Sequence, residues 1–458
     1  MAPTDRREFL RDAALLSGGL VFAFRLPSAS RRSPAAAAED TFKPNAFLRI
    51  AKDGSITIVA KHEEMGQGIH TTLALLVCEE LGASPEQVKV VFAPVDAAYA
   101  HTAFGMQITG GSSSTWSAYE QMRTAGASAR AMLVAAAAAR LGVAEGDLVT
   151  EAAVVKTKDG GKSVAFKDLV DDASQLTPPK AVKLKDPKQF TLVGKPQHRV
   201  DSAAKVRGEA VFGLDADLPG KKVAVVARCP WFGGKLVKHD ASKAEKMPGV
   251  ELIVTVPSGV AVIGKSFWHV NKAREALELE WDPGAMKDFS TEKQRADYLA
   301  RADQPGLVAR NEGDFAKAFA GAAKKLEAIY EVPYQAHAPM EPLSCMVHLQ
   351  GGKAHIVTST QMPTADRQAA AAILGVPPQR VTIQNCYFGG GFGRRASSRS
   401  DFIGEAVHVA KAAKEKGITA PIQVVWSRED DVRGGFYRPF WINRMWAALD
   451  DKGEIVGW

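Results

Sequence analysis

Three glycine-rich loops contain the residues of this sequence whose types and spacing could do chemistry. They are Gly66-Gln67-Gly68, Gly110-Gly111-Ser112-Ser113-Ser114 and Gly389-Gly390-Gly391-Phe392-Gly393. Glycine permits positive φ and lets another molecule approach the backbone N–H groups closely. Such N–H groups, at the start of a helix, bind phosphate-like anions. One loop of this kind is an ordinary helix cap, whereas three together predict one large ligand with several phosphate or carbonyl groups.

The two arginines that follow the third loop can be interpreted in two ways. Arg394 and Arg395 follow Gly393 directly and would add positive charge to an anion-binding loop. The alternative is a glycine-rich turn followed by two solvated arginines.

Strand-like and helix-like runs flank each loop. Residues 45–61 alternate around Lys52-Asp53-Gly54 and predict a β-hairpin before the first loop, and residues 71–81 predict a helix after it. Around the second loop we expect a strand at 88–92 and a helix at 116–141. Around the third we expect a strand at 380–385 and a helix at about 398–416. Each loop is therefore expected to lead into a helix N-terminus.

A further glycine segment matches the letters of a phosphate-binding P-loop. It reads Gly259-Val260-Ala261-Val262-Ile263-Gly264-Lys265-Ser266. A phosphate cradle needs a flexible loop between its glycines, whereas Val, Ala, Val and Ile favour a buried strand. We therefore expect a strand here. A nucleotide-binding protein that works through Lys265 is the alternative.

Composition narrows the classes of ligand. The formal net charge is +7, and residues 1–38 hold six arginines against three acidic residues, so the rest is only mildly basic. No basic tract is interleaved with aromatic residues, and we expect no nucleic-acid partner. The cysteines Cys78, Cys229, Cys345 and Cys386 show no CxxC spacing, so we predict neither an iron–sulfur cluster nor a protein-ligated metal in this chain.

The first residues are typical of an export signal. A twin-arginine pattern surrounds Arg6-Arg7, an apolar stretch follows at about 13–24, and Ala35-Ala36-Ala37-Ala38 offers a cleavage site. The apolar stretch is too short to span a bilayer, and no later run is long enough. We expect a signal peptide over 1–38, export by the twin-arginine pathway and a periplasmic protein without a stable membrane span. An uncleaved amphipathic tail is the alternative.

Several motifs occurring together resemble a known family. They are Glu64-Met65-Gly66-Gln67-Gly68, Thr109-Gly110-Gly111-Ser112-Ser113-Ser114, Thr358-Ser359-Thr360-Gln361 and Phe388-Gly389-Gly390-Gly391-Phe392-Gly393. With them, the chain resembles the molybdopterin-binding subunit of the xanthine dehydrogenase and aldehyde oxidase family. It looks most like the exported branch of isoquinoline 1-oxidoreductase beta subunits, in which the Met-Gly-Gln-Gly segment comes first in the chain.

The resemblance implies a molybdopterin cofactor, in its cytosine dinucleotide form, whose dithiolene holds molybdenum. The cofactor would lie against residues of the three loops, namely Gly66, Gln67, Gly68, Gly110, Gly111, Ser112, Ser113, Ser114, Gly390, Gly391, Phe392 and Gly393. Gln361 would donate its amide to a metal oxygen. The activity implied is oxidation of an N-heteroaromatic or aldehyde carbon with water-derived oxygen. Electrons would pass to a small subunit carrying a 2Fe-2S cluster, with a cytochrome c as a candidate acceptor.

Two departures from the family pattern qualify this expectation. The family's general base is a glutamate in a Gly-x-Gly-Glu motif, and no such motif occurs here. Xanthine dehydrogenase has a substrate-binding glutamate after Gly-Gly-Phe-Gly, where this chain has Arg395-Ala396-Ser397. That difference argues against a purine substrate.

The end of the sequence suggests a second interpretation of its function. Residues 446–458 read as strand, turn and strand, and the chain ends within the second strand. We expect the sequence to be incomplete at its C-terminus. A truncated, non-catalytic fragment that only binds the cofactor or a partner is therefore an alternative.

The expected fold class is α+β, with molybdopterin-binding domains and an inserted α/β hammerhead domain. After the signal peptide at 1–38 we expect an N-terminal molybdopterin-binding segment at 42–155, in permuted order, and a linker at 156–198. The hammerhead domain would cover 199–283, and an incomplete molybdopterin-binding domain 284–458.

Overall fold

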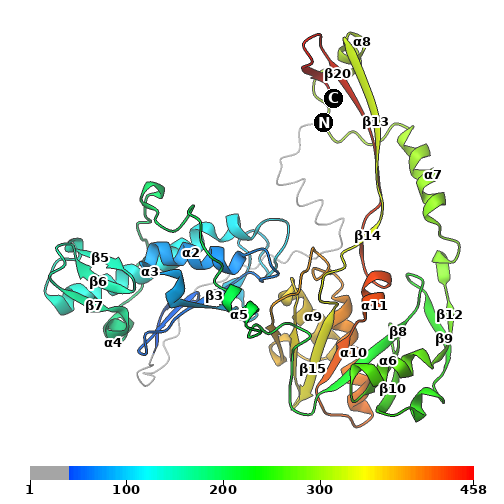
Figure 1. Ribbon diagram of the computed structural model, residues 1–458, viewed down its shortest axis with the longest axis horizontal. Helices are drawn as coiled ribbons and strands as arrows, with labels where there is room; N and C mark the ends of the chain where they lie inside the picture. The colour runs from blue at the N-terminus through cyan, green and yellow to red at the C-terminus, as the bar shows by residue number, and fades with distance from the viewer. Residues whose placement is uncertain (1–40) are drawn as a thin grey trace. The chain divides into compact units, whose positions relative to one another are not determined.

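A computed structural model describes residues 41–458 of the chain (Figure 1). The expected signal peptide at 1–38 lies outside these residues. Helices and strands are mixed along the described chain, as the predicted α+β class requires. In this part of the molecule no helix combines the length and the apolar character needed to cross a membrane.

The N-terminal segment begins with a four-stranded sheet in the order β1-β2-β3-β4. Its strands are Thr41–Asn45, Leu48–Ala51, Ile56–Ala60 and Val88–Phe92. The predicted hairpin is confirmed as β2 and β3, which pair antiparallel, and β4 lies parallel to β3. Helices α2 (Ile69–Leu81) and α3 (Ser114–Leu141) pack against each other (Figure 1). Gly126 of α3 allows this, because a Cβ there would press on the carbonyl of Val77.

The first part of the segment expected to be a linker at 156–198 is folded, up to residue 174, whereas only Pro187–Gln189 forms a regular turn of helix in the remainder. Strands β5 (Leu148–Glu151), β6 (Val154–Thr157) and β7 (Ser163–Ala165) form a small sheet that leads into helix α4 (Val170–Ser174). Phe166, Leu169 and Val170 belong to the same buried core as the N-terminal sheet and helices. The low periodicity of the sequence concealed elements of only three to five residues, so the linker prediction is wrong over this stretch.

The second large sheet has seven strands in the order β10-β11-β8-β18-β15-β16-β17. In that order the strands are Val250–Val256, Gly259–Gly264, Lys222–Arg228, Ile422–Val425, Ser344–Gln350, Lys353–Thr358 and Val381–Asn385. Strand β8 pairs in parallel with β18. The strands expected to form a separate hammerhead domain therefore share one sheet with strands of the predicted C-terminal domain.

Helices cover both faces of this sheet. Val260 and Val262 of β11 belong to the core around α6 (Phe267–Glu275). Ala261 and Ile263 alternate with them and belong to the core around α9 (Pro363–Leu374) and α10 (Asp401–Glu415). All of β11 is buried, so the P-loop letters lie in a central strand as predicted. This strand has no flexible glycine cradle, which contradicts the nucleotide-binding alternative.

The remaining elements are ribbons and short helices. The ribbons pair β9 (Lys235–Asp240) with β12 (Glu278–Asp282), β14 (Gln335–Ala336) with β19 (Tyr437–Arg438), and β13 (Lys324–Val332) with β20 (Trp441–Leu449) and β21 (Ile455–Gly457). The helices are α5 (Ser202–Val206), α7 (Thr291–Ala302), α8 (Phe315–Ala320) and α11 (Arg428–Arg433). Strands β20 and β21 confirm the predicted strand, turn and strand near residue 450.

Candidate functional site

Gln361 lies where segments from distant parts of the chain meet. It follows β16 and is only 2% exposed. Its backbone N–H donates to the carbonyl of Arg395 (3.0 Å), and its carbonyl accepts from the N–H of Thr109 (2.9 Å). Its side-chain Nε2 donates to the carbonyl of Thr109 (2.7 Å). The second and third glycine loops are therefore held together through Gln361.

The second and third loops approach the Gln361 side chain, and Met65, which precedes the first loop, lies against the third. A Cβ built on Gly391 would lie 3.1 Å from Gln361 Oε1 and 3.1 Å from the sulfur of Met65, which precedes Gly66. A Cβ on Gly110 would lie 4.0 Å from Gln361 Nε2. Among residues 41–458, Gln361 Oε1 has no hydrogen-bond partner. The structure thus places Gly110 and Gly391, two of the predicted residues, beside one buried side chain with an unsatisfied polar atom.

The first loop differs from the expected open anion site. The carboxylate of Glu64 accepts from the N–H groups of Gly66 (2.8 Å) and Gly68 (3.1 Å) in the loop and of His70 (3.0 Å) in the first turn of α2. Gln67 also hydrogen-bonds within the loop, to Met65 N–H and the Glu63 carbonyl. The N–H groups of Gly66, Gly68 and His70 are therefore not free for a ligand, because the chain supplies its own anion.

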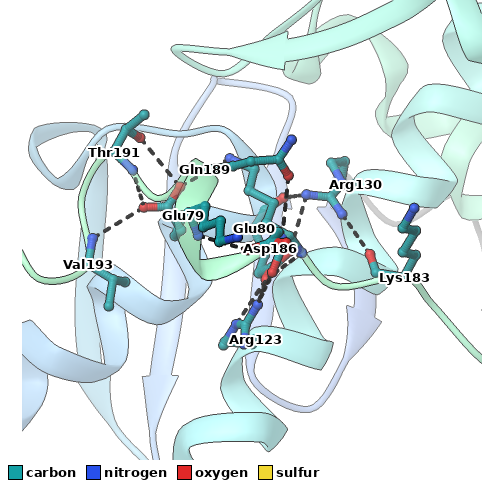
Figure 2. Close-up of polar contacts among 11 residues, drawn as sticks. Glu79, Glu80, Arg123, Arg130, Lys183, Asp186, Gln189, Thr191 and Val193 are labelled. Carbon is teal, nitrogen blue, oxygen red and sulfur yellow. Dashed lines mark hydrogen bonds and ion pairs between the residues drawn. The ribbon is translucent and has the colours of Figure 1, made fainter.

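Two carboxylates on the other end of α2 fix the helix to a downstream strap, residues 183–193 (Figure 2). Glu79 Oε2 accepts from the successive N–H groups of Thr191 (2.9 Å), Leu192 (2.7 Å) and Val193 (3.2 Å). The Glu80 carboxylate accepts from Arg123, Arg130 and the N–H of Lys185. The helix behind the first loop is thus held by buried charge as well as by apolar packing.

The second loop leads into α3 as predicted. Gly111 and Ser112 both have positive φ (64° and 54°), and both are exposed. Ser113 instead is buried, with its hydroxyl donating to the carbonyl of Gly110 (2.6 Å) and 2.9 Å from the Nε2 of His101. A cavity of about 830 Å³ adjoins the loop, and Ser112, Thr115 and Trp116 line it. Because the first N–H groups of a helix have no partner within it, this terminus can receive an anion.

The two arginines after the third loop are neither solvated nor directed to a ligand. Arg395 is 1% exposed and donates from Nη2 to the Glu341 carboxylate (2.9 Å), from Nε to the carbonyl of Gly390 (3.0 Å), and to further backbone oxygens. Arg394 pairs with Asp401 (2.7 Å), the first residue of α10. The interpretation as solvated arginines is therefore wrong, because both side chains are buried and paired with carboxylates inside the chain.

Phe392 is exposed at the tip of the third loop. Its ring is 72% exposed, and its backbone φ is 54°, a conformation that bulky residues rarely adopt. Gly390 and Gly393 on either side also have positive φ (97° and 98°). Such strain costs on the order of 1–3 kcal/mol and is typical of functional loops.

Sequence reasoning missed several acids at this site. Glu63 is fully buried beside the first loop, where burial raises its pKa to about 8, opposed by a hydrogen bond from Asn385. Its Oε2 has no hydrogen-bond partner among the described residues. Two adjacent glutamates before a glycine loop were the available signal for Glu63 and Glu64. Nothing local indicated Glu341, which lies 48 residues from its partner Gly389.

The other residues predicted to bind the cofactor differ in their exposure to solvent. Gly391 is buried, and Gly68, Gly110, Ser114 and Gly390 are half-buried. Gly66, Gln67 and Gly393 are exposed. In residues 41–458 no cluster of three or more His, Cys, Asp or Glu side chains is arranged to hold a metal ion.

Comparison with known families identifies the domains. Two profiles described as molybdopterin cofactor-binding domain match residues 22–211 and 300–458. The chain is 30% identical to the isoquinoline 1-oxidoreductase beta subunit of Brevundimonas diminuta, over 99% of this chain and 63% of that protein. It is 28% identical to a membrane-bound aldehyde dehydrogenase (pyrroloquinoline-quinone) of Gluconacetobacter polyoxogenes, over 99% of this chain and 60% of that protein.

A nicotinate dehydrogenase subunit of Pseudomonas putida is 28% identical over 84% of this chain and 32% of its own length. Among solved structures, quinoline 2-oxidoreductase from Pseudomonas putida 86 matches with a TM-score of 0.43 and 16% identity, over 56% of this chain and 37% of that one. The chain thus spans less than two thirds of these curated relatives.

The domain matches and the relatives define the class: this is a chain of molybdopterin cofactor-binding domains. Its relatives include the isoquinoline 1-oxidoreductase beta subunit and, at lower identity, proteins named as xanthine dehydrogenases.

Proposed function

We propose that this chain is the molybdopterin-binding part of a molybdenum hydroxylase. Its substrate would be an N-heteroaromatic compound or an aldehyde, and electrons would leave through a separate 2Fe-2S subunit. The observation that carries the proposal is the meeting of the second and third glycine loops at Gln361, whose buried Oε1 has no partner in residues 41–458. A buried unsatisfied polar atom is costly, so its persistence supports a ligand at this position.

Of the helix starts expected to bind the anionic part of a molybdopterin dinucleotide, the structure supports one more strongly than another. The start of α3, with Ser112 and Thr115 beside the 830 Å³ cavity, suits the anionic part of the cofactor. The start of α2 does not, because Glu64 already accepts its N–H groups. When bound, the cofactor would supply the redox-active metal. Gln361 would orient the ligand through its side-chain amide, of which one N–H is held by the Thr109 carbonyl.

Metal and nucleotide analysis tests this proposal. The full chain, co-expressed with a molybdenum-cofactor maturation system, should purify with molybdenum and release cytidylate on acid hydrolysis. Gln361→Leu should lower the molybdenum content severalfold. Because one relative is named for pyrroloquinoline quinone, the same preparation should be assayed for that quinone. Quinone without molybdenum or cytidylate would contradict the proposal.

A cofactor-binding fragment without catalysis is the second candidate. In residues 1–458 no Gly-x-Gly-Glu motif occurs, which keeps this alternative open. A molybdenum-loaded chain that turns over neither N-heteroaromatic nor aldehyde substrates, with a 2Fe-2S subunit and an artificial electron acceptor supplied, would support this candidate. Turnover would exclude it.

Export is also part of the proposal. The twin-arginine pattern at Arg6-Arg7 supports folding in the cytoplasm, delivery to the periplasm and transfer of electrons there to an acceptor such as a cytochrome c. Replacing Arg6-Arg7 by two lysines should retain the protein in the cytoplasm, as cell fractionation would show. Equal periplasmic yield of this variant would contradict the export route.

A further inference from the structure

Buried residues at the bases of the three glycine loops are hydrogen-bonded to one another. Glu63 and Thr109 come shortly before the first and second loops, and Asn385 is the last residue of β17, the strand that leads into the third. With Thr360 and Gln361 they make five residues, none of which is more than 8% exposed. The contacts among them join segments that are far apart in the sequence.

The side-chain amide of Asn385 continues the pairing of β16 with β17 beyond the ends of these parallel strands. Thr358 and Asn385 are the last paired residues. Two residues further along, the N–H of Thr360 donates to Asn385 Oδ1 (3.0 Å), and Asn385 Nδ2 donates to the carbonyl of Thr360 (3.3 Å). Since a backbone N–H only donates and a carbonyl only accepts, these bonds fix the orientation of the amide. Asn385 therefore fixes the backbone immediately before Gln361.

Thr109 and Glu63 complete the connection on the other side of Gln361. The N–H of Thr109 donates to the carbonyl of Gln361 (2.9 Å), and Gln361 Nε2 donates to the carbonyl of Thr109 (2.7 Å). The hydroxyl of Thr109 accepts from the N–H of Glu63 (2.8 Å). The carboxyl of Glu63 in turn accepts a hydrogen bond from the side chain of Asn385. The five residues thus form a closed hydrogen-bonded ring, which we call the loop-base ring.

A closed ring differs from an ordinary set of satisfied buried polar groups. Where a buried group is satisfied locally, each bond acts by itself. Asn45 is such a case, because its Nδ2 donates to the carbonyl of Ala125 (3.0 Å) and its Oδ1 accepts from the N–H of Phe47 (2.9 Å). In a connected buried network the bonds support one another, so the loss of one bond loosens members that it does not touch.

We propose that Asn385 and Thr109 are positioning residues, which hold Gln361 and the bases of the three glycine loops as one preorganised unit. Asn385 acts through the backbone of Thr360, and Thr109 acts through the side chain of Gln361. Such preorganisation lowers the cost of ordering a site when its ligand binds. The inference rests on the proposed function for the role of Gln361 at a cofactor, but the coupling within the ring is measurable without one.

Hydrogen exchange of single amides in the full chain, purified without molybdenum, tests the coupling. Asn385→Leu keeps the size of the side chain and removes its hydrogen bonds. It should speed exchange about tenfold or more at Thr360, and also at Glu63, whose N–H is bound by Thr109. That factor is the effect of losing one or two buried hydrogen bonds.

Thr109→Val makes the reciprocal test and serves in its place should Asn385→Leu fail to fold. It removes the acceptor of the Glu63 N–H, and it should speed exchange at Thr360, to which the hydroxyl of Thr109 is not bonded. Thr109→Ser keeps an acceptor hydroxyl and should return exchange at Thr360 most of the way to that of the parent.

Asn45→Leu is the matched control, because it removes an asparagine that also donates to one backbone group and accepts from another. It should leave exchange at Glu63 and Thr360 as in the parent. In chain loaded by a maturation system, Asn385→Leu and Thr109→Val should lower the molybdenum content severalfold, whereas Asn45→Leu should not.

Two results would overturn the inference. One is exchange that rises only at the amides bonded to the substituted side chain, which would show that the ring does not act as a unit. The other is a parent that binds molybdenum with Asn385→Leu and Thr109→Val variants that bind as much. A parent without molybdenum would instead refute the proposed function, and the exchange pattern would still decide whether the ring is coupled.

Discussion

Arg395 and Glu341 form a buried ion pair, with Nη2 of the arginine 2.9 Å from Oε2 of the glutamate. The same carboxylate accepts the N–H groups of Gly389 (2.8 Å) and Leu214 (2.8 Å), so it joins the third glycine loop to two other segments. Glu341→Gln should leave the Arg395 charge buried without its counterion and lower the free energy of unfolding by about 3–5 kcal/mol. Urea unfolding followed by circular dichroism measures this.

The control for that variant is Glu209→Gln, which removes an exposed partner of Arg207. Exposed ion pairs contribute little to stability, so this change should not move the unfolding midpoint measurably. Equal effects of the two substitutions would show that the Arg395–Glu341 pair does not hold the loop.

Glu79 fastens the strap at 183–193 to α2 through three consecutive backbone N–H groups (Figure 2). Glu79→Gln removes the charge and leaves only one acceptor atom in place of two. Hydrogen bonds to charged groups contribute about 1.5–3 kcal/mol each, so the loss should exceed about 1.5 kcal/mol. Amide hydrogen exchange should rise over the strap and leave β15 to β17 unchanged. Exposed Glu86→Gln should have neither effect, and unchanged exchange at 191–193 in Glu79→Gln would refute the anchoring role.

Glu63 should make stability depend on pH. Its folded pKa is raised to about 8 by burial, against about 4.3 in an unfolded chain. Between these values the folded protein holds a proton that the unfolded chain has released, so stability falls as pH rises and the penalty is complete above about pH 8. Glu63→Gln should therefore gain at least about 1.4 kcal/mol relative to the parent on going from pH 4.5 to 8.

Urea midpoints of Glu63→Gln and the parent at several pH values measure this gain. Exposed Glu145→Gln serves as the control and should run parallel to the parent. A constant difference between Glu63→Gln and the parent across the range would mean that Glu63 titrates normally.

Helices and strands were predicted correctly where the residues of the element itself determine its structure. The P-loop letters at 259–266 were correctly expected to form a strand, because Val260 to Ile263 are apolar on both faces of β11. The alternation of apolar and polar residues over 45–61 likewise predicted the hairpin of β2 and β3. The glycine loops were predicted from their glycine content, and Gly68, Gly390 and Gly393 do adopt positive φ, which glycine tolerates.

Long-range partners were beyond the reach of such patterns. Residues 223–227 read as a strand, yet nothing in them indicates that β8 pairs with β18, about 200 residues away. Glu64 is six residues from His70, but a glutamate before a loop reads equally well as solvated. Arg395 looks like a surface charge until Glu341 is placed beside it. Burial is a property of the packed chain, and it overturned the interpretation of Arg394 and Arg395 as solvated residues.

Two neighbouring glycines of the third loop separate folding from cofactor binding. Neither Gly389 nor Gly391 has positive φ, so alanine is compatible with the backbone at both. A Cβ at Gly389 would overlap the Cβ of Glu341, whereas a Cβ at Gly391 would lie 3.1 Å from Gln361 Oε1 and from the Met65 sulfur. Gly389→Ala should therefore destabilise by several kcal/mol, about 3 or more, as overpacking against backbone does.

Gly391→Ala should cost less than about 1.5 kcal/mol, because the flexible Met65 side chain can yield. It should still displace Gln361 and reduce the molybdenum bound per chain severalfold. Pairing it with Met65→Ala should restore part of that content, since the truncation returns the space that the new methyl group takes. Metal content by mass spectrometry and urea unfolding midpoints, measured on the same samples, test the expected loss of molybdenum and the expected small loss of stability. A Gly391→Ala protein with full molybdenum would show that the contact of Gly391 with Gln361 is not part of the cofactor site.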